Sequence, residues 1–261
     1  MGLRGKCALI TGSTGGLGRI VAEHFASEGC NVVLNGVVPQ SEMTVAIADL
    51  EKTHGIKASY DQTDLRKPEE IAAMMQRAFA AFGTVDILVN NAVVRHLSPI
   101  DQFPVERWDE ALAVNISAVF HTIRLALPSM RQRGWGRIIN VASPYSFIAI
   151  ANRIDYVTTK TALLGLTRTV ALETAGEDIT CNAVAPATLP TPAIEAKIRS
   201  IAEDQGISVD TAKQDYLAER QPGGRFVSMQ AVAALMGFLC GPHSRDISGA
   251  AIPMDCGWTV S

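Results

Sequence analysis

Short apolar runs alternate with helix-like stretches along most of the chain, and this alternation limits the possible folds more than any other feature. The runs read KCALIT, NVVLN, IKASY, VDILVN, GRIINVA, ITCNAVA and, near the end, GAAIPMD. Runs of this kind are typical of parallel strands that are buried on both faces. Helical periodicity lies between them, over Leu17–Glu28, Ser41–His54, Pro68–Phe82, Val105–Arg133 and Tyr156–Ala175. We therefore expect an α/β fold, with a doubly wound parallel sheet of about seven strands and helices on both faces.

One segment, residues 186–224, interrupts the alternation. It contains several prolines and then reads IEAKIRSIAEDQ and DTAKQDYLAER, which are polar and helical patterns. An insertion of this length can cover a binding site, so we expect a lid here. The sequence shows no internal repeat, linker or low-complexity tract, and we expect one domain over residues 1–261.

Composition narrows the classes of partner. Apolar residues make up 48% of the chain, which suits a buried core, and a net charge of -3 with dispersed Lys and Arg gives no footprint for nucleic acid or an anionic membrane. No apolar run approaches the roughly 20 residues of a membrane-spanning helix, and the first residues do not resemble a signal peptide. We expect a cytoplasmic protein that binds neither nucleic acid nor membrane.

The cysteines point to a reducing compartment rather than to a metal site or a disulfide framework. They lie far apart, with no CxxC motif and no metal-ligand spacing. Several fall in apolar runs, where a buried free thiol is the ordinary explanation. The five residues are Cys7, Cys30, Cys181, Cys240 and Cys256.

A glycine loop, ITGSTGGLGRIV, follows the first apolar run and opens the first helix. Gly12, Gly16 and Gly18 have the spacing G-x-x-x-G-x-G, which differs from the G-x-G-x-x-G dinucleotide fingerprint. The physics is the same, because a tight glycine turn lets backbone amides at a helix N-terminus approach a pyrophosphate closely. The pattern predicts a Rossmann-type dinucleotide site.

The end of the second run should determine which dinucleotide binds. An acidic residue there would bind the 2′-hydroxyl of NAD, and a basic one would meet the 2′-phosphate of NADP. This run ends VVLNGVVPQ, with neither. Asn35 can bind a hydroxyl and offers no countercharge to a phosphate, so we expect NAD. Arg19, just past the glycine loop, is a basic residue that can meet a 2′-phosphate, so NADP is the alternative cofactor.

A second motif, DYVTTK, places Tyr156 four residues before Lys160. On a helix these positions share one face, and a lysine near a tyrosine can stabilise the phenolate and lower a phenol pKa from about 10. An isolated pair of this kind is most often an accidental surface pair. The rest of the chain has to decide between the two readings.

Taken together, these features resemble the short-chain dehydrogenase/reductase family over essentially the whole chain. The order of motifs carries the resemblance: the glycine loop, DQT at Asp61–Thr63, NNAV at Asn90–Val93, Asn115 in a long helix, and Ser143 thirteen residues before Tyr156. The resemblance implies a hydride-transfer enzyme that acts on a small hydroxy or keto compound.

The resemblance also implies roles for individual residues. Tyr156 would be the general acid or base, Lys160 would assist it and hold the nicotinamide ribose, Ser143 would bind the substrate oxygen, and Asn115 would place a water in a proton relay. A helix-cap role for Ser143 and a core amide role for Asn115 are the alternatives. The predicted cofactor-binding residues are Thr11, Gly12, Thr14, Gly16, Leu17, Gly18, Asn35, Asp61, Gln62, Asn90, Ala92, Tyr156, Lys160, Pro186, Thr188 and Leu189.

Within the family, stretches such as VVLNG, GRIINVAS and DCGW are similar to bacterial 3-hydroxybutyrate dehydrogenases, which use NAD. The substrate pocket of that subgroup is altered. Its Gln, His, Lys, Trp and second Gln are replaced by Arg95, Tyr145, Arg153, Thr188 and Lys197, and its tail tryptophan is kept as Trp258. Arg95 and Arg153 can clamp a carboxylate. We expect substrate contacts from Arg95, Ser143, Tyr145, Arg153, Thr188 and Trp258.

Three glycines that are usual in the family are replaced, by Val93, Ala187 and Cys256. Val93 and Ala187 would lie near the nicotinamide, where they either shape the pocket wall or have no effect.

Other functions remain open on the same resemblance. An NADPH-dependent ketone or 3-oxoacyl reductase keeps the chemistry and changes the cofactor. A halohydrin dehalogenase would lack Lys160 and the glycine loop, and a catalytically silent cofactor-binding protein would have a broken set of catalytic residues. The long helices Val105–Arg133 and Tyr156–Ala175 are apolar around much of their circumference, and the family is typically tetrameric, so we expect a homotetramer.

Overall fold

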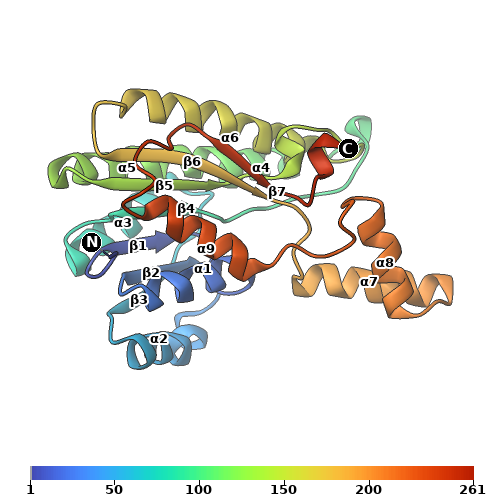
Figure 1. The fold of residues 1–261 in the computed structure, drawn as a ribbon, viewed down its shortest axis with the longest axis horizontal. Helices are drawn as coiled ribbons and strands as arrows, with labels where there is room; N and C mark the ends of the chain where they lie inside the picture. Colours follow the sequence, from blue (N-terminus) through green and yellow to red (C-terminus); the bar gives the residue numbers. More distant parts are fainter. Residues whose placement is uncertain (1) are drawn as a thin grey trace.

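The computed structural model describes residues 2–261 and contains one parallel sheet (Figure 1). The strand order is β3-β2-β1-β4-β5-β6-β7, and every neighbouring pair is parallel. Each strand lies on one of the seven predicted runs, so the predicted doubly wound sheet is confirmed. The strands are β1 (Cys7–Ile10), β2 (Asn31–Gly36), β3 (Ala58–Gln62), β4 (Ile87–Asn90), β5 (Gly136–Val141), β6 (Ile179–Pro186) and β7 (Ala251–Met254).

Helices cover both faces of the sheet because each presents an apolar stripe to it. On one face, α1 (Gly16–Ser27), α2 (Gln40–His54) and α9 (Met229–Cys240) share a core with side chains such as Phe25, Leu50 and Met236. On the other, α3 (Pro68–Phe82), α5 (Ala118–Arg133) and α6 (Ile154–Glu173) pack around Met74, Met130 and Leu163. The apolar helix α9 was missed by the sequence prediction.

The predicted single helix Val105–Arg133 is divided. It consists of α4 (Val105–Leu112), a π-helical turn over Ala113–Ser117, and α5. By length and composition alone this path is long and apolar enough to span a membrane, which corrects the prediction that no apolar run approaches that length. Half of its most apolar window is buried inside the protein. Its apolar side chains face α3 and the sheet, as in a core helix. The prediction failed because it sought an uninterrupted apolar run.

The predicted lid contains a pair of helices, α7 (Pro192–Gln205) and α8 (Val209–Ala218). Figure 1 shows them beyond the end of the sheet, apart from the two helical layers. They have a small core of their own around Ile198, Ala202 and Ala212. The buried side chain of Gln221 joins the two ends of the segment, since it accepts a hydrogen bond from the Thr188 amide and donates one to the Arg225 carbonyl. The lid is therefore a distinct helical hairpin with a fixed base.

The thiols are all free. Four are buried, and burial raises the pKa of both Cys30 and Cys181 to about 12, which makes them poor nucleophiles. This agrees with the expectation of buried free thiols.

Candidate active site

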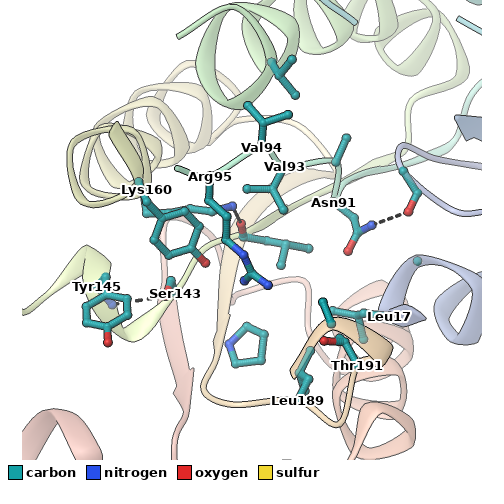
Figure 2. Close-up of a pocket in the computed structure, with 18 of the residues that line it drawn as sticks. Leu17, Asn91, Val93, Val94, Arg95, Ser143, Tyr145, Lys160, Leu189 and Thr191 are labelled. Carbon is teal, nitrogen blue, oxygen red and sulfur yellow. Dashed lines mark hydrogen bonds between the residues drawn. The ribbon is translucent and has the colours of Figure 1, made fainter. Parts of the chain in front are cut away.

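A cavity of ≈ 990 Å³ opens at the carboxyl ends of the strands, where β1 and β4 are neighbours in the sheet and their loops turn to opposite faces. Ligands of doubly wound sheets bind at this switch point. Figure 2 shows side chains from the β4 loop, the end of β5, helix α6 and the start of the lid around one space. The cavity size suits a dinucleotide together with a small substrate.

The glycine loop forms one end of the cavity, and its backbone is of the kind that a pyrophosphate requires. Gly12 and Gly16 have φ values of +61° and +54°, in the left-handed region that favours glycine. A Cβ on Gly12 would lie 2.8 Å from the Ala92 Cα atom, and one on Gly36 would lie 2.5 Å from Thr14 Cγ2. Glycine at these positions therefore lets the loop pack closely against the segment after β4 and the end of β2, with the N-terminus of α1 at the cavity. The residues present therefore fit a nicotinamide dinucleotide, which the fold implies.

The residues expected to discriminate between NAD and NADP are engaged within the protein. Asn35 is buried; its side chain accepts a hydrogen bond from the Gly12 amide and donates to the carbonyls of Asp61 and Thr63. Its amide thus ties β2 to the glycine loop and competes with the predicted contact to a ribose. Arg19 pairs with Glu23, with 2.9 Å between Nε and Oε1.

Three more predicted cofactor residues have partners inside the protein. The Asp61 carboxylate is bound by Arg77 of α3 through Nε at 2.6 Å and Nη2 at 2.8 Å. Asn90 donates to Asn140 and accepts from Thr122, and the Thr11 hydroxyl accepts from the amides that follow β4. These side chains hold the strand ends in place. None of the three lines the cavity.

Asn91, which the sequence prediction missed, lines the cavity beside them. Its Nδ2 donates to the carbonyls of Thr11 and Gly12 at 3.0 and 2.9 Å, so it fastens the glycine loop to the end of β4. The doubled Asn of NNAV was the available signal. Of the predicted cofactor residues, those on the cavity wall are Gly12, Thr14, Leu17, Gly18, Asn35, Ala92, Tyr156, Lys160, Pro186, Thr188 and Leu189; Thr11, Gly16, Asp61, Gln62 and Asn90 are not.

Tyr156 and Lys160 lie on the first turns of α6 and both face the cavity. Lys160 is 3% exposed and its ammonium donates to the Val141 carbonyl at the end of β5. Burial, reinforced by the nearby Arg95 guanidinium, lowers the pKa of Lys160 to about 7. The Lys160 Nζ atom is 5.8 Å from the centre of the Tyr156 ring. Among residues 2–261 the Tyr156 hydroxyl has no hydrogen-bond partner, so it is available to a ligand.

Ser143 follows β5 and has the cap role that was the alternative for it. Its Oγ accepts from the Tyr145 amide at 3.3 Å, while its own amide donates to Ser146 Oγ. The Ser143 hydroxyl hydrogen has no acceptor within the described part of the chain, and the side chain lines the cavity. The cap therefore orients the hydroxyl and leaves its hydrogen free to donate.

Asn115 lies in the π-helical turn and is buried. Its side chain accepts from the Val94 amide at 2.9 Å and donates to the Val94 carbonyl and to Thr159 Oγ1. This is the core amide that was the alternative for it. Its predicted role in a water relay stays a prediction; its bonds hold the loop that carries Arg95.

Asp155, between Arg153 and Tyr156, was not among the predicted site residues. It is fully buried, and its carboxylate accepts hydrogen bonds from the Tyr156 amide at 2.7 Å and the His96 amide at 2.9 Å. One carboxylate therefore joins the start of α6 to the loop of Arg95. Its position near a helix N-terminus favours the negative charge.

The predicted substrate residues gather at the other end of the cavity, where Arg95, Ser143, Tyr145, Arg153, Thr188 and Trp258 all line the wall. The Tyr145 ring contacts Tyr156 and Trp258 edge-on, with centroids 6.1 and 5.2 Å apart. Figure 2 shows Arg95 extending across the space toward Leu189 and Thr191. Arg153 donates to the His96 carbonyl at 3.5 Å. Val93 and Ala187, which replace family glycines, also line the wall.

The lid adds lining residues that the sequence prediction did not assign to the site: Lys197 on α7, Tyr216 on α8, and Arg220 just after α8. The spacing of Tyr216 and Arg220 by four residues in a helical pattern was a weak signal for a shared face. Across residues 2–261, no group of three or more His, Cys, Asp or Glu side chains is arranged to hold a metal ion.

Comparison with known proteins agrees with this architecture. A family model described as short chain dehydrogenase matches residues 6–201. The chain belongs to the short-chain dehydrogenase family. It is therefore an oxidoreductase that acts on CH–OH groups. A D-β-hydroxybutyrate dehydrogenase of Cupriavidus necator is 42% identical over 258 residues, covering 99% of this chain and 99% of that protein. The Rhizobium meliloti D-β-hydroxybutyrate dehydrogenase is 40% identical, covering 98% of this chain and 99% of that protein.

Solved structures of the family agree as well. The L-sorbose reductase from Gluconobacter frateurii, in complex with NADPH and L-sorbose, superimposes with a TM-score of 0.94 at 30% identity, covering 100% of this chain and 99% of that one. The short-chain dehydrogenase family binds a nicotinamide cofactor, and the relatives differ in substrate.

Proposed function

We propose that this short-chain dehydrogenase transfers a hydride between NAD(H) and a small hydroxy or keto carboxylate, such as a 3-hydroxy acid. One observation carries the proposal: the free hydroxyl of Tyr156, beside the buried Lys160, shares a cavity with Arg95 and Arg153. A guanidinium fork matches a carboxylate. The likeness to D-β-hydroxybutyrate dehydrogenases supports a hydroxy carboxylate as substrate.

When bound, the nicotinamide supplies or accepts the hydride. Gly12, Thr14 and Gly18 would hold its diphosphate, and Lys160 its ribose. Tyr156 gives a proton to the carbonyl oxygen during reduction and takes it back during oxidation. Ser143 donates its free hydroxyl hydrogen to the same oxygen and stabilises the charge that develops there. The hydrogen bond to the Val141 carbonyl holds the Lys160 ammonium beside the Tyr156 ring, 5.8 Å from its centre.

NAD is the proposed cofactor because no basic side chain is free at the end of β2. Arg19 lies on α1 and pairs with Glu23 four residues further along the helix. The NADPH complex of L-sorbose reductase favours the second candidate, an NADPH-dependent ketone or 3-oxoacyl reductase. A 3-oxoacyl-[acyl-carrier-protein] reductase of Aquifex aeolicus, 32% identical over 98% of both chains, points the same way.

The test is to follow NADH and NADPH oxidation across small ketones and keto acids, with Tyr156→Phe as a control. We expect NADH to be preferred and keto acids to turn over faster than neutral ketones. A strong preference for NADPH would favour the second candidate. Full activity in Tyr156→Phe would refute the mechanism.

A cytoplasmic homotetramer is the proposed assembly. On α5 and α6, Phe120 is 53% exposed and Leu172 is 80% exposed, which fits helices that pack against other copies of the chain. Light scattering coupled to gel filtration would measure the mass, with four copies of the 27.9 kDa chain as the expected result.

A further inference from the structure

Four cationic side chains surround the substrate end of the cavity. Arg95 and Arg153 come from the β4 loop and the start of α6, and we call them the body pair. Lys197 and Arg220 come from the lid, and we call them the lid pair. All four line the cavity wall. The body pair accounts for one carboxylate, as proposed above, so the lid pair needs a separate explanation.

The lid pair is grouped around one aromatic ring. The Arg220 guanidinium carbon lies 4.1 Å from the centre of the Tyr216 ring, and the Lys197 Nζ atom lies 5.7 Å from the same centre. Arg220 also donates to the Tyr216 carbonyl at 2.9 Å. The ring therefore holds both cations at the same part of the lid.

The protein supplies little negative charge to this cluster. The acidic residues on the cavity wall are Asp64 and Glu110. Asp64 is bound by Arg66 at 2.6 Å, and Glu110 by Arg107 at 2.9 Å. Arg220 has one carboxylate partner, Glu219, whose side chain is 71% exposed, and such surface pairs contribute little. Within residues 2–261, Arg95 and Lys197 have no ion-pair or hydrogen-bond partner.

The four cations also affect one another. Partial burial lowers the pKa of Lys197, and Arg220, Arg153 and Arg95 lower it further. Like charges brought together without a counterion repel, so this arrangement becomes favourable when anions enter the cavity.

We propose that the substrate is a dianion: a small hydroxy or keto acid whose second anionic group, a carboxylate or a phosphate, is bound by Lys197 and Arg220. The proposal rests on the proposed function, because it assigns the first carboxylate to the body pair and the reacting carbon to Tyr156. One guanidinium fork is sufficient for one carboxylate, and a second pair of cations on the lid part of the cavity wall matches a second anion.

The first test compares substrates that differ in one charge. 3-Hydroxyglutarate and its monomethyl ester have almost the same carbon skeleton, and 3-hydroxybutyrate lacks the second group. With NAD, we expect kcat/KM for the diacid to exceed that for the ester at least tenfold, equivalent to ~1.4 kcal/mol. Malate, 3-hydroxyadipate and 4-phospho-3-hydroxybutyrate extend the series, and they distinguish a carboxylate from a phosphate as the second group.

The second test uses lid variants with matched controls. Lys197→Met and Arg220→Gln should each raise KM for the preferred dianion about tenfold, while KM for 3-hydroxybutyrate and for NAD changes less than twofold. Lys213 and Arg199 are also lid cations but do not line the cavity. Lys213→Met and Arg199→Gln should therefore leave both constants unchanged.

A binding measurement separates failure of this proposal from failure of the proposed function. Calorimetry with glutarate and with butyrate, neither of which can react, should show tighter binding of glutarate to the NAD-loaded Tyr156→Phe variant, and Lys197→Met should remove the difference. If the protein turned over hydroxy or keto acids, but kcat/KM for monoanions equalled or exceeded kcat/KM for dianions, the dianion proposal alone would be overturned. A rise in KM for NAD in the lid variants would overturn it too, by assigning the lid pair to the cofactor. No turnover of any hydroxy or keto acid would refute the proposed function, while the calorimetry would still decide whether the cavity binds dianions.

Discussion

Two regions of the cavity, the surroundings of Tyr156 and the cluster of cations, are built differently. Around Tyr156, the protein supplies the partners: Lys160 binds the Val141 carbonyl, Ser143 caps a turn, and Asp155 binds two amides. At the cationic end, Arg95 and Lys197 are exposed and lack partners among the described residues. Packing thus fixes the proposed chemistry, whereas the charges that would select the substrate are left for the substrate to satisfy.

The largest effect should come from removing the proposed proton donor. Tyr156→Phe should lower kcat by roughly 10²–10⁴-fold on every substrate, since that is the usual contribution of general acid–base catalysis. Steady-state kinetics on mono- and dianionic substrates would measure it. Tyr60→Phe is the control, because Tyr60 does not line the cavity and its hydroxyl donates to the Val38 carbonyl. If kcat fell only with dianionic substrates, the proton donor and the charge-binding region would not act separately.

Asp155 joins the two ends, so its loss should impair both. Asp155→Ala leaves the amides of Tyr156 and His96 without acceptors and should lower the free energy of unfolding by about 1–3 kcal/mol. We also expect kcat to fall and KM for the anionic substrate to rise, with partial recovery in Asp155→Asn. Urea denaturation and kinetics would test this. Asp109→Ala, on the exposed surface of α4, should change neither quantity.

The buried Lys160 should make stability depend on pH. Its pKa falls from 10.5 to about 7 on folding, so between these values the unfolded chain binds more protons and stability rises with pH. At pH 7 and below, the full penalty for burying the charge is present. Lys160→Met should therefore be more stable than the wild type near pH 7, with an advantage that shrinks by up to ~1.4 kcal/mol per pH unit toward pH 10. Urea unfolding at pH 7, 8 and 9 measures this; a constant difference would contradict it.

The smallest effect should lie at the base of the lid. Cys256 has a φ of +53°, where the family has glycine, and its side chain faces Gly223. Cys256→Gly should relieve the left-handed strain and raise the free energy of unfolding by less than about 1 kcal/mol, because the added flexibility of the unfolded chain offsets part of the gain. Gly257→Ala, at φ +88°, should lower it. Thermal unfolding measures both variants, and a loss of stability in Cys256→Gly or a gain in Gly257→Ala would reject the explanation.

The sequence predicted the fold closely because local patterns determine it. Buried parallel strands produce apolar runs, and helices produce their own period, so all seven strands were located and α9 was the main omission. The predicted catalytic motif could be recognised in the sequence for the same reason, because Tyr156 and Lys160 are one turn apart on one helix.

Tertiary structure decided which side chains are free to act. Asn35, Asp61 and Asn90 have the residue types of ligands, yet their partners come from other strands and helices and engage them inside the protein. Lys197 and Arg220 line the cavity because α7 and the end of α8 form part of its wall. A local pattern shows which face a residue lies on, but a hydrogen bond or ion pair between distant segments depends on how the elements pack. For this protein, the sequence by itself determined the sheet and the proposed reaction centre, and the packing decided which charges remain for a substrate.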